Sequence, residues 1–324
     1  MIKVNNLVKT FGATKAVNDI SFEVTEGETL ALLGTSGCGK TTTLKMLNRL
    51  IEPDSGTIEI NGKDIFNEPA EILRRNMGYV LQNNGLFPHY TVAENIAVVP
   101  NLLKWDKAKT EKRTVELLEK LHLSKDHLNA YPNELSGGQQ QRVGLARALV
   151  ADAPVLLMDE PFGALDNVTR SKIHAEFKVL DELKRKTIIM VTHDVQEAFE
   201  LADRIALMDK GKIVQIGTAN ELLFNPVNDF VKDFLKEQHL QLELKTIKLI
   251  DVWQYLPSDG PRINTSQLAA TAGIWEALDT FKFYPRENIN ILNQQSKEVR
   301  SVTFDQLLSA YNQHKIMTYD KSSL

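Results

Sequence analysis

Residues 29 to 47, TLALLGTSGCGKTTTLKML, contain a glycine-rich segment with the residue types that bind phosphate. It lies between an apolar strand and a helix start and matches G-x-x-x-x-G-K-T, with fixed positions Gly34, Gly39, Lys40 and Thr41. Glycines let successive backbone N–H groups turn toward one anion, and the following helix adds its positive end. We expect Lys40 to reach the outer phosphates and Thr41 to ligate Mg²⁺. The alternative is a chance match, which the flanking strand and helix disfavour.

A pair of carboxylates follows a second apolar run. In VLLMDEPFGALD, residues 155 to 166, Asp159 and Glu160 stand at the end of a strand whose unbroken apolar sequence indicates burial on both faces. Open α/β sheets bind ligands at the carboxyl ends of their strands. We expect Asp159 to orient Mg²⁺ through its water shell and Glu160 to be the general base for an attacking water. Taken alone, the pair would suit exposed carboxylates that cap a turn before Pro161.

Two more apolar strands end in polar side chains. YVLQ ends in Gln82, whose amide oxygen would ligate Mg²⁺ or bind the attacking water, and IIMVTHD places His193 where it would face the transferred phosphoryl group. Either residue by itself is more often structural, but the other motifs favour a shared site. Near the N-terminus, Phe11 and Val17 flank a short polar loop. Phe11 would stack on a purine ring, with core packing as an equal alternative.

A further glycine-containing segment, LSGGQQQR, occupies residues 135 to 142. Ser136 and the N–H groups of Gly137 and Gly138 stand before a helix start, where they can hold an anion. In isolation, a flexible turn that caps a helix would be the better interpretation.

These motifs lie in a chain that alternates strands with helices up to about residue 240, which predicts an α/β fold with a largely parallel sheet. A stretch from about 91 to 150 breaks this alternation and indicates a helical insertion. Residues 225 to 244 are expected to form a closing helix, and about 80 residues follow, with their clearest loop at 256 to 261. The expected strands are 2–8, 20–24, 29–33, 57–60, 78–81, 155–158, 187–192, 204–209 and 212–216, and the expected helices of the insertion are 91–103, 107–123 and 137–150.

Length and composition narrow the class of protein. The 324 residues allow two domains, and the net charge of -4 argues against a surface built for nucleic acid. Cys38 is the only cysteine, so no intrachain disulfide is possible and a reducing cytosol is favoured. We expect Cys38 to be a small loop residue, not a reactive thiol. The apolar runs are far shorter than the roughly 20 residues that span a bilayer, and the N-terminus does not look like a signal peptide.

Together the motifs resemble the nucleotide-binding subunit of ABC transporters over about residues 1 to 240. The resemblance implies a P-loop ATPase fold whose Walker A loop, Q-loop, Walker B strand and switch histidine share one ATP site. It assigns catalytic roles to Lys40, Gln82, Glu160 and His193, Mg²⁺ coordination to Thr41, Gln82 and Asp159, and a dimer contact in the D-loop to Asp166. The implied ATP-binding residues are Phe11, Val17, Gly34, Thr35, Ser36, Gly37, Cys38, Gly39, Lys40, Thr41 and Thr42.

LSGGQQQR resembles the ABC signature, which in this family caps the γ-phosphate bound to the Walker A loop of a second subunit. The residues with this role in trans would be Leu135, Ser136, Gly137, Gly138 and Gln139. ATP would then join two copies of the chain and hydrolysis would release them. Closure would move the helical insertion, and a groove around residues 82 to 90, with Phe87 and Tyr90, would grip short helices of integral-membrane permease subunits. These partners imply a peripheral location on the cytoplasmic face of the membrane.

The segments NNGLFPHYTVAENI and DEPFGALDNVTR resemble those of importer ATPases for glycine betaine, carnitine or choline. Such ATPases work with a permease and an external solute-binding protein. Asn167 departs from the proline often found there. Import of another small solute, such as an amino acid or a polyamine, remains an alternative. So does a soluble ABC ATPase acting on DNA or ribosomes, although the acidic balance disfavours it. A regulatory module without turnover would be expected to lack a base, and Glu160 is present.

Residues 241 to 324 resemble a single CBS module, with helices at 271–283 and 304–311 and strands at 288–292 and 299–303. Such modules work in pairs, so this one would pair with the copy in another chain. It would stabilise the dimer or sense ionic strength or a nucleotide, and a degenerate tail is the alternative. Trp253 and Trp275 are expected to lie in its core.

Overall fold

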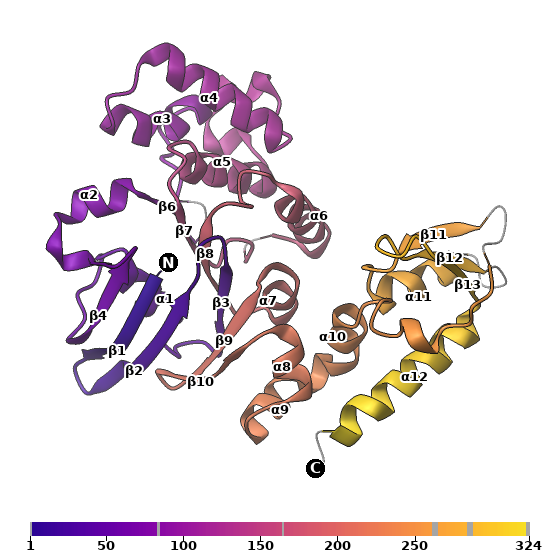
Figure 1. The fold of residues 1–324 in the computed structure, drawn as a ribbon. Helices are drawn as coiled ribbons and strands as arrows, with labels where there is room; N and C mark the ends of the chain where they lie inside the picture. The colour runs from indigo at the N-terminus through magenta and orange to yellow at the C-terminus, as the bar shows by residue number, and fades with distance from the viewer. Residues whose placement is uncertain (1, 83–84, 164, 261–264, 284–287, 322–324) are drawn as a thin grey trace. The chain divides into compact units, whose positions relative to one another are not determined.

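The computed structural model describes residues 2–82, 85–163, 165–260, 265–283 and 288–321 (Figure 1). The chain divides into two units, Met1–Ile216 and Gly217–Leu324, each with its own apolar core. We call them the N-terminal and the C-terminal unit. This division falls at the end of β10 (Lys212–Gly217), one residue before that strand ends. The functional boundary near residue 240, which would assign the next helices to the ATPase domain, stays a prediction.

A six-stranded sheet forms the centre of the N-terminal unit, with strand order β10-β9-β3-β8-β7-β6. β3 pairs in parallel with β8 and β9, and β7 pairs in parallel with β8 and β6. β7 and β8 are buried along their whole length, which explains their continuous apolar centres. The predicted parallel α/β core is confirmed. The strands of the six-stranded sheet are β3 (Thr29–Gly34), β6 (Met77–Val80), β7 (Val155–Asp159), β8 (Thr187–Thr192), β9 (Arg204–Asp209) and β10 (Lys212–Gly217).

The remaining strands of this unit form a second sheet that the sequence analysis did not separate from the first. Its order is β2-β1-β4-β5, and β1 pairs antiparallel with both β2 and β4. Buried and partly exposed residues alternate at the start of β1, as expected for a strand with one covered face. The two sheets share one apolar core. The strands are β1 (Ile2–Phe11), β2 (Thr14–Val24), β4 (Ser55–Ile60) and β5 (Lys63–Asp64).

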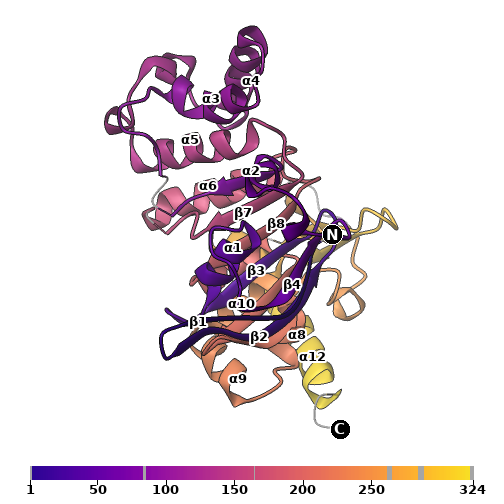
Figure 2. The same cartoon turned by 90° about the vertical axis from the view of Figure 1, so that its left-hand side faces the viewer.

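Helices connect the strands, and three of them form the predicted insertion, α3 (Val92–Leu102), α4 (Lys107–Lys120) and α5 (Gly137–Leu149). Figures 1 and 2 show them together at one end of the N-terminal unit. Reciprocal capping boxes start α3 and α5, formed by Thr91 with Glu94 and by Ser136 with Gln139. The other helical segments are α1 (Lys40–Leu47), η1 (Ile65–Asn67), α2 (Ala70–Arg75), η2 (Lys125–Asn129), η3 (Pro132–Glu134), α6 (Asn167–Val179) and α7 (Val195–Leu201).

The C-terminal unit begins with short helices where one closing helix was predicted over 225 to 244. That prediction is wrong, because the backbone leaves helical geometry at Gln238 (φ -108°, ψ 2°). Asn228 caps the helix that starts at Asp229 by accepting a hydrogen bond from the Val231 N–H. The segments are α8 (Ala219–Phe224), α9 (Asp229–Leu235), the single 3₁₀ turn η4 (Lys236–Gln238) and α10 (His239–Thr246).

A three-stranded sheet with order β11-β12-β13 follows, in which β12 is parallel to β11 and antiparallel to β13. The strands and helices predicted after residue 270 are present, whereas β11 was not predicted. Trp253 packs against the core of this unit, but Trp275 is 40% exposed, so its predicted core position is wrong. The CBS-like identity stays a prediction. The elements are η5 (Trp253–Tyr255), β11 (Ser266–Ala269), α11 (Ile274–Phe283), β12 (Ile289–Leu292), β13 (Val299–Val302) and α12 (Phe304–Lys321).

The loop predicted at 256 to 261 is described up to residue 260, and residues 83 and 84 of the predicted groove also lie outside the described residues. Within the described part of the chain, no helix combines the length and apolarity needed to cross a membrane.

Candidate nucleotide-binding site

The phosphate loop joins the end of β3 to the start of α1. Gly39 has φ +104°, and a Cβ at this position would lie 2.2 Å from the carbonyl oxygen of Ala16, so only glycine fits without a backbone shift. The Lys40 side chain is buried and curls back over the loop, where its Nζ donates to the Gly34 and Thr35 carbonyl oxygens at 2.8 Å each. The Lys40 ammonium group is therefore held against the backbone of the phosphate loop.

Asp159, at the end of β7, reaches the first turn of α1. Its Oδ1 accepts a hydrogen bond of 2.9 Å from the Thr41 hydroxyl. Burial raises the pKa of the Asp159 carboxyl, and the nearby Glu160 carboxylate raises it further, while the Thr41 hydroxyl lowers it. A cation placed here would oppose the effect of burial. The site therefore offers a hard cation oxygen ligands of the kind Mg²⁺ prefers.

Among the described residues, no group of three or more His, Cys, Asp and Glu side chains gathers to bind a metal ion. A Mg²⁺ ion at Thr41 and Asp159 would thus take further ligands from phosphate and water, as it commonly does in nucleotide sites. The predicted coordination by Gln82, whose amide Nε2 donates to Glu160 in this structure, stays a prediction. The residues present fit such an ion.

Glu160 stands where three strand ends meet. Its Oε2 accepts from Gln82 Nε2 at 3.1 Å and lies 3.3 Å from His193 Nδ1. Its backbone has φ +46°, a sparsely populated conformation for a non-glycine residue, and its N–H donates to the Val191 carbonyl of β8 at 2.9 Å. The turn after β7 thus aims this carboxylate away from the sheet and toward the phosphate loop. The structure brings these three predicted side chains together.

The phosphate loop and the side chains of Gln82, Glu160 and His193 line one hollow of about 580 Å³. Phe11 is half exposed rather than in the core, with the Lys9 ammonium 5.6 Å from the centre of its ring. The side chain of Val17 is fully buried, and the neighbouring Ala16, which the sequence analysis missed, contributes to the wall. The lining residues are Ala16, Ser36, Gly37, Gly39, Lys40, Thr41, Thr42, Gln82, Glu160 and His193.

Cys38 is buried beneath the same loop, with its Sγ 3.7 Å from Lys40 Nζ. Burial raises the pKa of its thiol, which disfavours the reactive thiolate. This supports the expectation of a small loop residue.

The signature segment lies elsewhere in the N-terminal unit, at the start of α5. Ser136 Oγ accepts from the Gln139 N–H at 3.3 Å, and the Gln139 side chain accepts from the Ser136 N–H at 2.8 Å. A Cβ on Gly137 would meet no atom within 4 Å, so the space in front of this glycine is open. None of the described residues from 135 to 139 lines the hollow of the phosphate loop. Their predicted role toward another chain's nucleotide stays a prediction.

The segment that leads from Gln82 to α3 carries exposed aromatic rings. Phe87 and Tyr90 are 42% and 38% exposed, and their ring centres lie 5.3 Å apart. Their predicted contact with a membrane partner would need this exposure.

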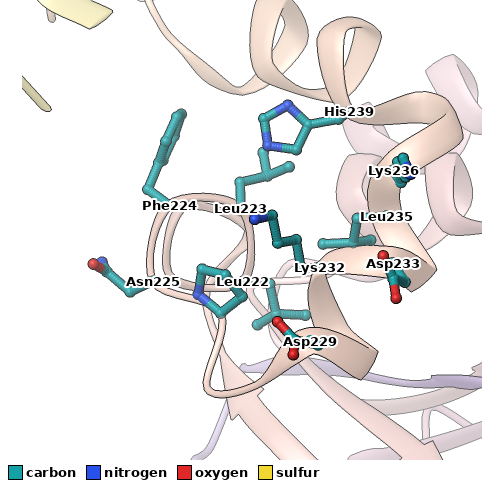
Figure 3. A pocket seen from close by; sticks show the side chains of 11 residues that line it. Leu222, Leu223, Phe224, Asn225, Asp229, Lys232, Asp233, Leu235, Lys236 and His239 are labelled. Carbon is teal, nitrogen blue, oxygen red and sulfur yellow. The ribbon is translucent and has the colours of Figure 1, made fainter. Parts of the chain in front are cut away.

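The C-terminal unit contains a larger hollow of about 980 Å³ between α8 and the segment from α9 to α10 (Figure 3). Leu222, Leu223 and Leu235 contribute apolar surface, and the charged lining includes both lysine and aspartate side chains, which are Asp229, Lys232, Asp233 and Lys236. No glycine-rich loop of the described chain lines this hollow. The larger of the two hollows is therefore not the one with the residues for phosphate binding.

Comparisons with known proteins agree with the geometry. A family model described as ABC transporter matches residues 17–163. The glycine betaine/carnitine/choline transport ATP-binding protein of Bacillus subtilis is 51% identical over 241 residues, which are 74% of this chain and 63% of that protein. The glycine betaine uptake system ATP-binding protein of Escherichia coli is 45% identical over 308 residues, which are 95% of this chain and 99% of that protein.

Among solved structures, a dimeric ATP-binding cassette in a post-hydrolysis state, bound to ADP and phosphate, has a TM-score of 0.61 and 33% identity. The match covers 67% of this chain and 98% of that chain. The predicted resemblance is therefore confirmed at the level of the family, and this chain belongs to the ATP-binding proteins of ABC transporters.

Proposed function

We propose that the chain hydrolyses ATP and thereby drives an ABC importer for a quaternary-amine osmoprotectant such as glycine betaine, carnitine or choline. The observation that carries the hydrolytic part is the convergence of Gln82 and His193 on Oε2 of Glu160, beside the phosphate loop. The solute class is supported by the names of the relatives in Bacillus subtilis and Escherichia coli. The first of these is longer than the region it shares with this chain, so its transport activity is carried over only as part of the proposal.

The residues have separate tasks in this mechanism. The loop amides and Lys40 bind the outer phosphates, and the ammonium can exchange its contacts with the loop carbonyls for phosphate oxygens. Thr41 and Asp159 would hold Mg²⁺, which when bound would neutralise charge on the phosphates. Phe11 offers an exposed ring for the purine.

Glu160 receives the proton of the attacking water. The Gln82 amide donates to Oε2, and His193 does so when its Nδ1 carries a proton, which together orient the carboxylate. No partner for Oε1 occurs among the described side chains, so that oxygen is available to a water. An oriented base next to the phosphate loop favours hydrolysis over simple nucleotide binding.

A second copy of the chain would complete the site with its Ser136, Gly137 and Gly138, which stand at a helix start that suits an anion, with open space in front of Gly137. The solved relative is likewise dimeric. Permease subunits would bind the segment with Phe87 and Tyr90, and an external solute-binding protein would deliver the solute. These partners would keep the chain at the cytoplasmic face of the membrane.

Replacement of the base tests the hydrolytic proposal. In the full chain with Mg²⁺ and ATP, Glu160→Gln should lower turnover by at least about a hundredfold, because the amide cannot accept the water proton. Light scattering should then detect an ATP-dependent dimer. Glu71→Gln, an exposed substitution on α2, is the matched control and should keep wild-type turnover. Undiminished turnover of Glu160→Gln would remove Glu160 as the base.

Uptake by proteoliposomes that contain the chain, its permease and its binding protein tests the solute class. Unlabelled glycine betaine, carnitine or choline should compete with a labelled quaternary amine. Uptake of amino acids or polyamines, without any of a quaternary amine, would contradict the proposed solute class and leave the ATPase proposal intact.

A further inference from the structure

Arg170, in the first turn of α6, connects two loops of the N-terminal unit. Its Nη2 donates to the carbonyl oxygen of Leu165 at 2.9 Å, and its Nη1 donates to Oδ2 of Asp194 at 3.1 Å. Leu165 directly precedes Asp166, and Asp194 directly follows His193. One planar guanidinium thus joins the loop expected at a dimer contact to the loop that carries the switch histidine.

The contact at Asp194 reaches the position of His193 through the backbone. The other carboxylate oxygen, Oδ1, accepts from the N–H groups of Gln196 and Glu197 at 2.9 and 3.2 Å and so caps α7. The Asp194 N–H in turn donates to the Thr192 hydroxyl at 2.9 Å. His193 is therefore flanked by two anchored residues, and Arg170 supplies the ion pair that anchors one of them to α6.

The same turn of α6 contacts the signature segment. A Cβ on Gly138 would lie 2.8 Å from Cγ2 of Thr169, so the first turns of α5 and α6 are closely packed at this point. The Thr169 N–H also donates to Oδ1 of Asp166 at 3.0 Å. Figure 1 shows α6 beside α5, and residues of α6 also contact α7. The first turn of α6 thus contacts the signature glycine, the Asp166 loop and the switch-histidine loop.

We propose that Arg170 is a positioning residue that holds His193 in place against Glu160 and links this placement to the signature and Asp166 segments of the same chain. The inference rests on the proposed ATPase function. In a dimer, movement of the segments that face the partner's nucleotide would reach this chain's own switch histidine through α6. The two ATP sites would then turn over cooperatively.

The test compares Arg170→Met, which keeps apolar bulk but removes both hydrogen bonds, with Arg170→Lys, which keeps the charge but cannot make the same fork. For Arg170→Met, the turnover number should fall between about tenfold and a hundredfold, with less than about a twofold change in KM for ATP. The Hill coefficient for ATP should fall from about 2 toward about 1. Arg170→Lys should recover part of the turnover.

Arg113→Met is the matched control. Arg113 also holds a carboxylate, Glu182, at 2.9 Å with a largely buried side chain, but it belongs to α4 and contacts neither loop. The Arg113→Met variant should keep the wild-type turnover number and Hill coefficient. A merely structural role of Arg170 would instead give equal effects in the two methionine variants.

Hydrogen exchange supplies a readout that does not need catalysis. Amides of residues 193 to 197 should exchange about tenfold faster in Arg170→Met than in the wild type, whereas those of α4 should not. If Arg170→Met fails to fold, Arg170→Lys gives the same comparison with a smaller expected change. Unchanged exchange, or an unchanged turnover number and Hill coefficient, would overturn the inference. A wild-type chain without turnover would instead contradict the proposed function, while the exchange data would still decide whether Arg170 positions the loop.

Discussion

Glu197, on α7 behind the switch-histidine loop, is a buried carboxyl group with no direct part in the proposed mechanism. It is 3% exposed, its Oε2 accepts from the Thr192 hydroxyl at 3.1 Å, and its Oε1 has no hydrogen-bond partner within the described structure. Burial raises the pKa of Glu197 to about 8, with the carboxylates of Asp194 and Glu160 adding to the effect. The folded protein therefore keeps a proton here at neutral pH.

This proton makes stability depend on pH. An unfolded chain loses the proton near the ordinary pKa of 4.5, whereas the folded chain keeps it up to about pH 8. The folded state binds more protons in this interval, so the contribution of Glu197 to stability falls as the pH rises from 4.5 to 8. Glu197→Gln should remove this loss. Its free energy of unfolding relative to the wild type should rise by about 1 to 3 kcal/mol between pH 5 and pH 8.

Urea unfolding at pH 5, 6.5 and 8 would measure the change. Glu134→Gln, at a carboxylate outside this network, should show no such trend with pH. A difference between Glu197→Gln and the wild type that stays constant across the three pH values would contradict the assignment of the raised pKa.

At the scale of the element, α3 holds the segment that precedes it through one buried amide. Asn95 is fully buried, its Oδ1 accepts from the Phe87 N–H at 2.8 Å, and its Nδ2 donates to the carbonyl oxygens of Phe87, Tyr90 and Thr91 at 3.0 to 3.1 Å. The helix thus presents the exposed rings of Phe87 and Tyr90 in a defined arrangement. Few other side chains could serve, because the position needs both an acceptor and two donors.

Asn95→Ala should therefore increase the mobility of residues 87 to 91 and leave the phosphate loop largely unchanged. The unpaired backbone groups should cost about 1 to 3 kcal/mol of stability. Hydrogen exchange at Phe87 should accelerate, and transport with the permease should fall more than the ATP turnover of the isolated chain. The control is Asn101→Ala, at an exposed position of the same helix. Equal losses of transport and isolated turnover would argue against a docking role.

At the scale of the whole molecule, each unit has a separate apolar core. Val191 and Leu32 belong to the core of the N-terminal unit, and Ile291 and Leu307 to that of the C-terminal unit. Nucleotide binding should stabilise the unit that contains the phosphate loop. We therefore expect two calorimetric transitions, of which one responds to ATP.

Ile291→Ala should destabilise the C-terminal unit by about 2 to 5 kcal/mol, because Ile291 is fully buried on β12. The midpoint temperature of the ATP-responsive transition should not change. Val191→Ala on β8 is the reciprocal control and should shift the ATP-responsive transition. Calorimetry of the Glu160→Gln background, with and without ATP, would measure both. A single transition that moves with either substitution would show that the two cores unfold as one.

The sequence by itself determined the motifs and the class of fold, because each motif is a short run whose geometry is mostly local. The glycines and Lys40 of the phosphate loop and the two carboxylates at the end of the 155–158 apolar run could be identified from a few neighbouring residues. Continuous apolar runs identified the buried parallel strands for the same reason.

Only the tertiary structure decided which distant residues meet. Gln82 and Glu160 are 78 positions apart, and their contact depends on β6 and β7 being neighbours in the sheet. The bridge from Arg170 to Asp194 and the exposure of Trp275 likewise depend on packing between elements, as does the separation of β1, β2 and β4 into an antiparallel sheet. Local preferences define an element, but burial and pairing between elements set where its side chains lie.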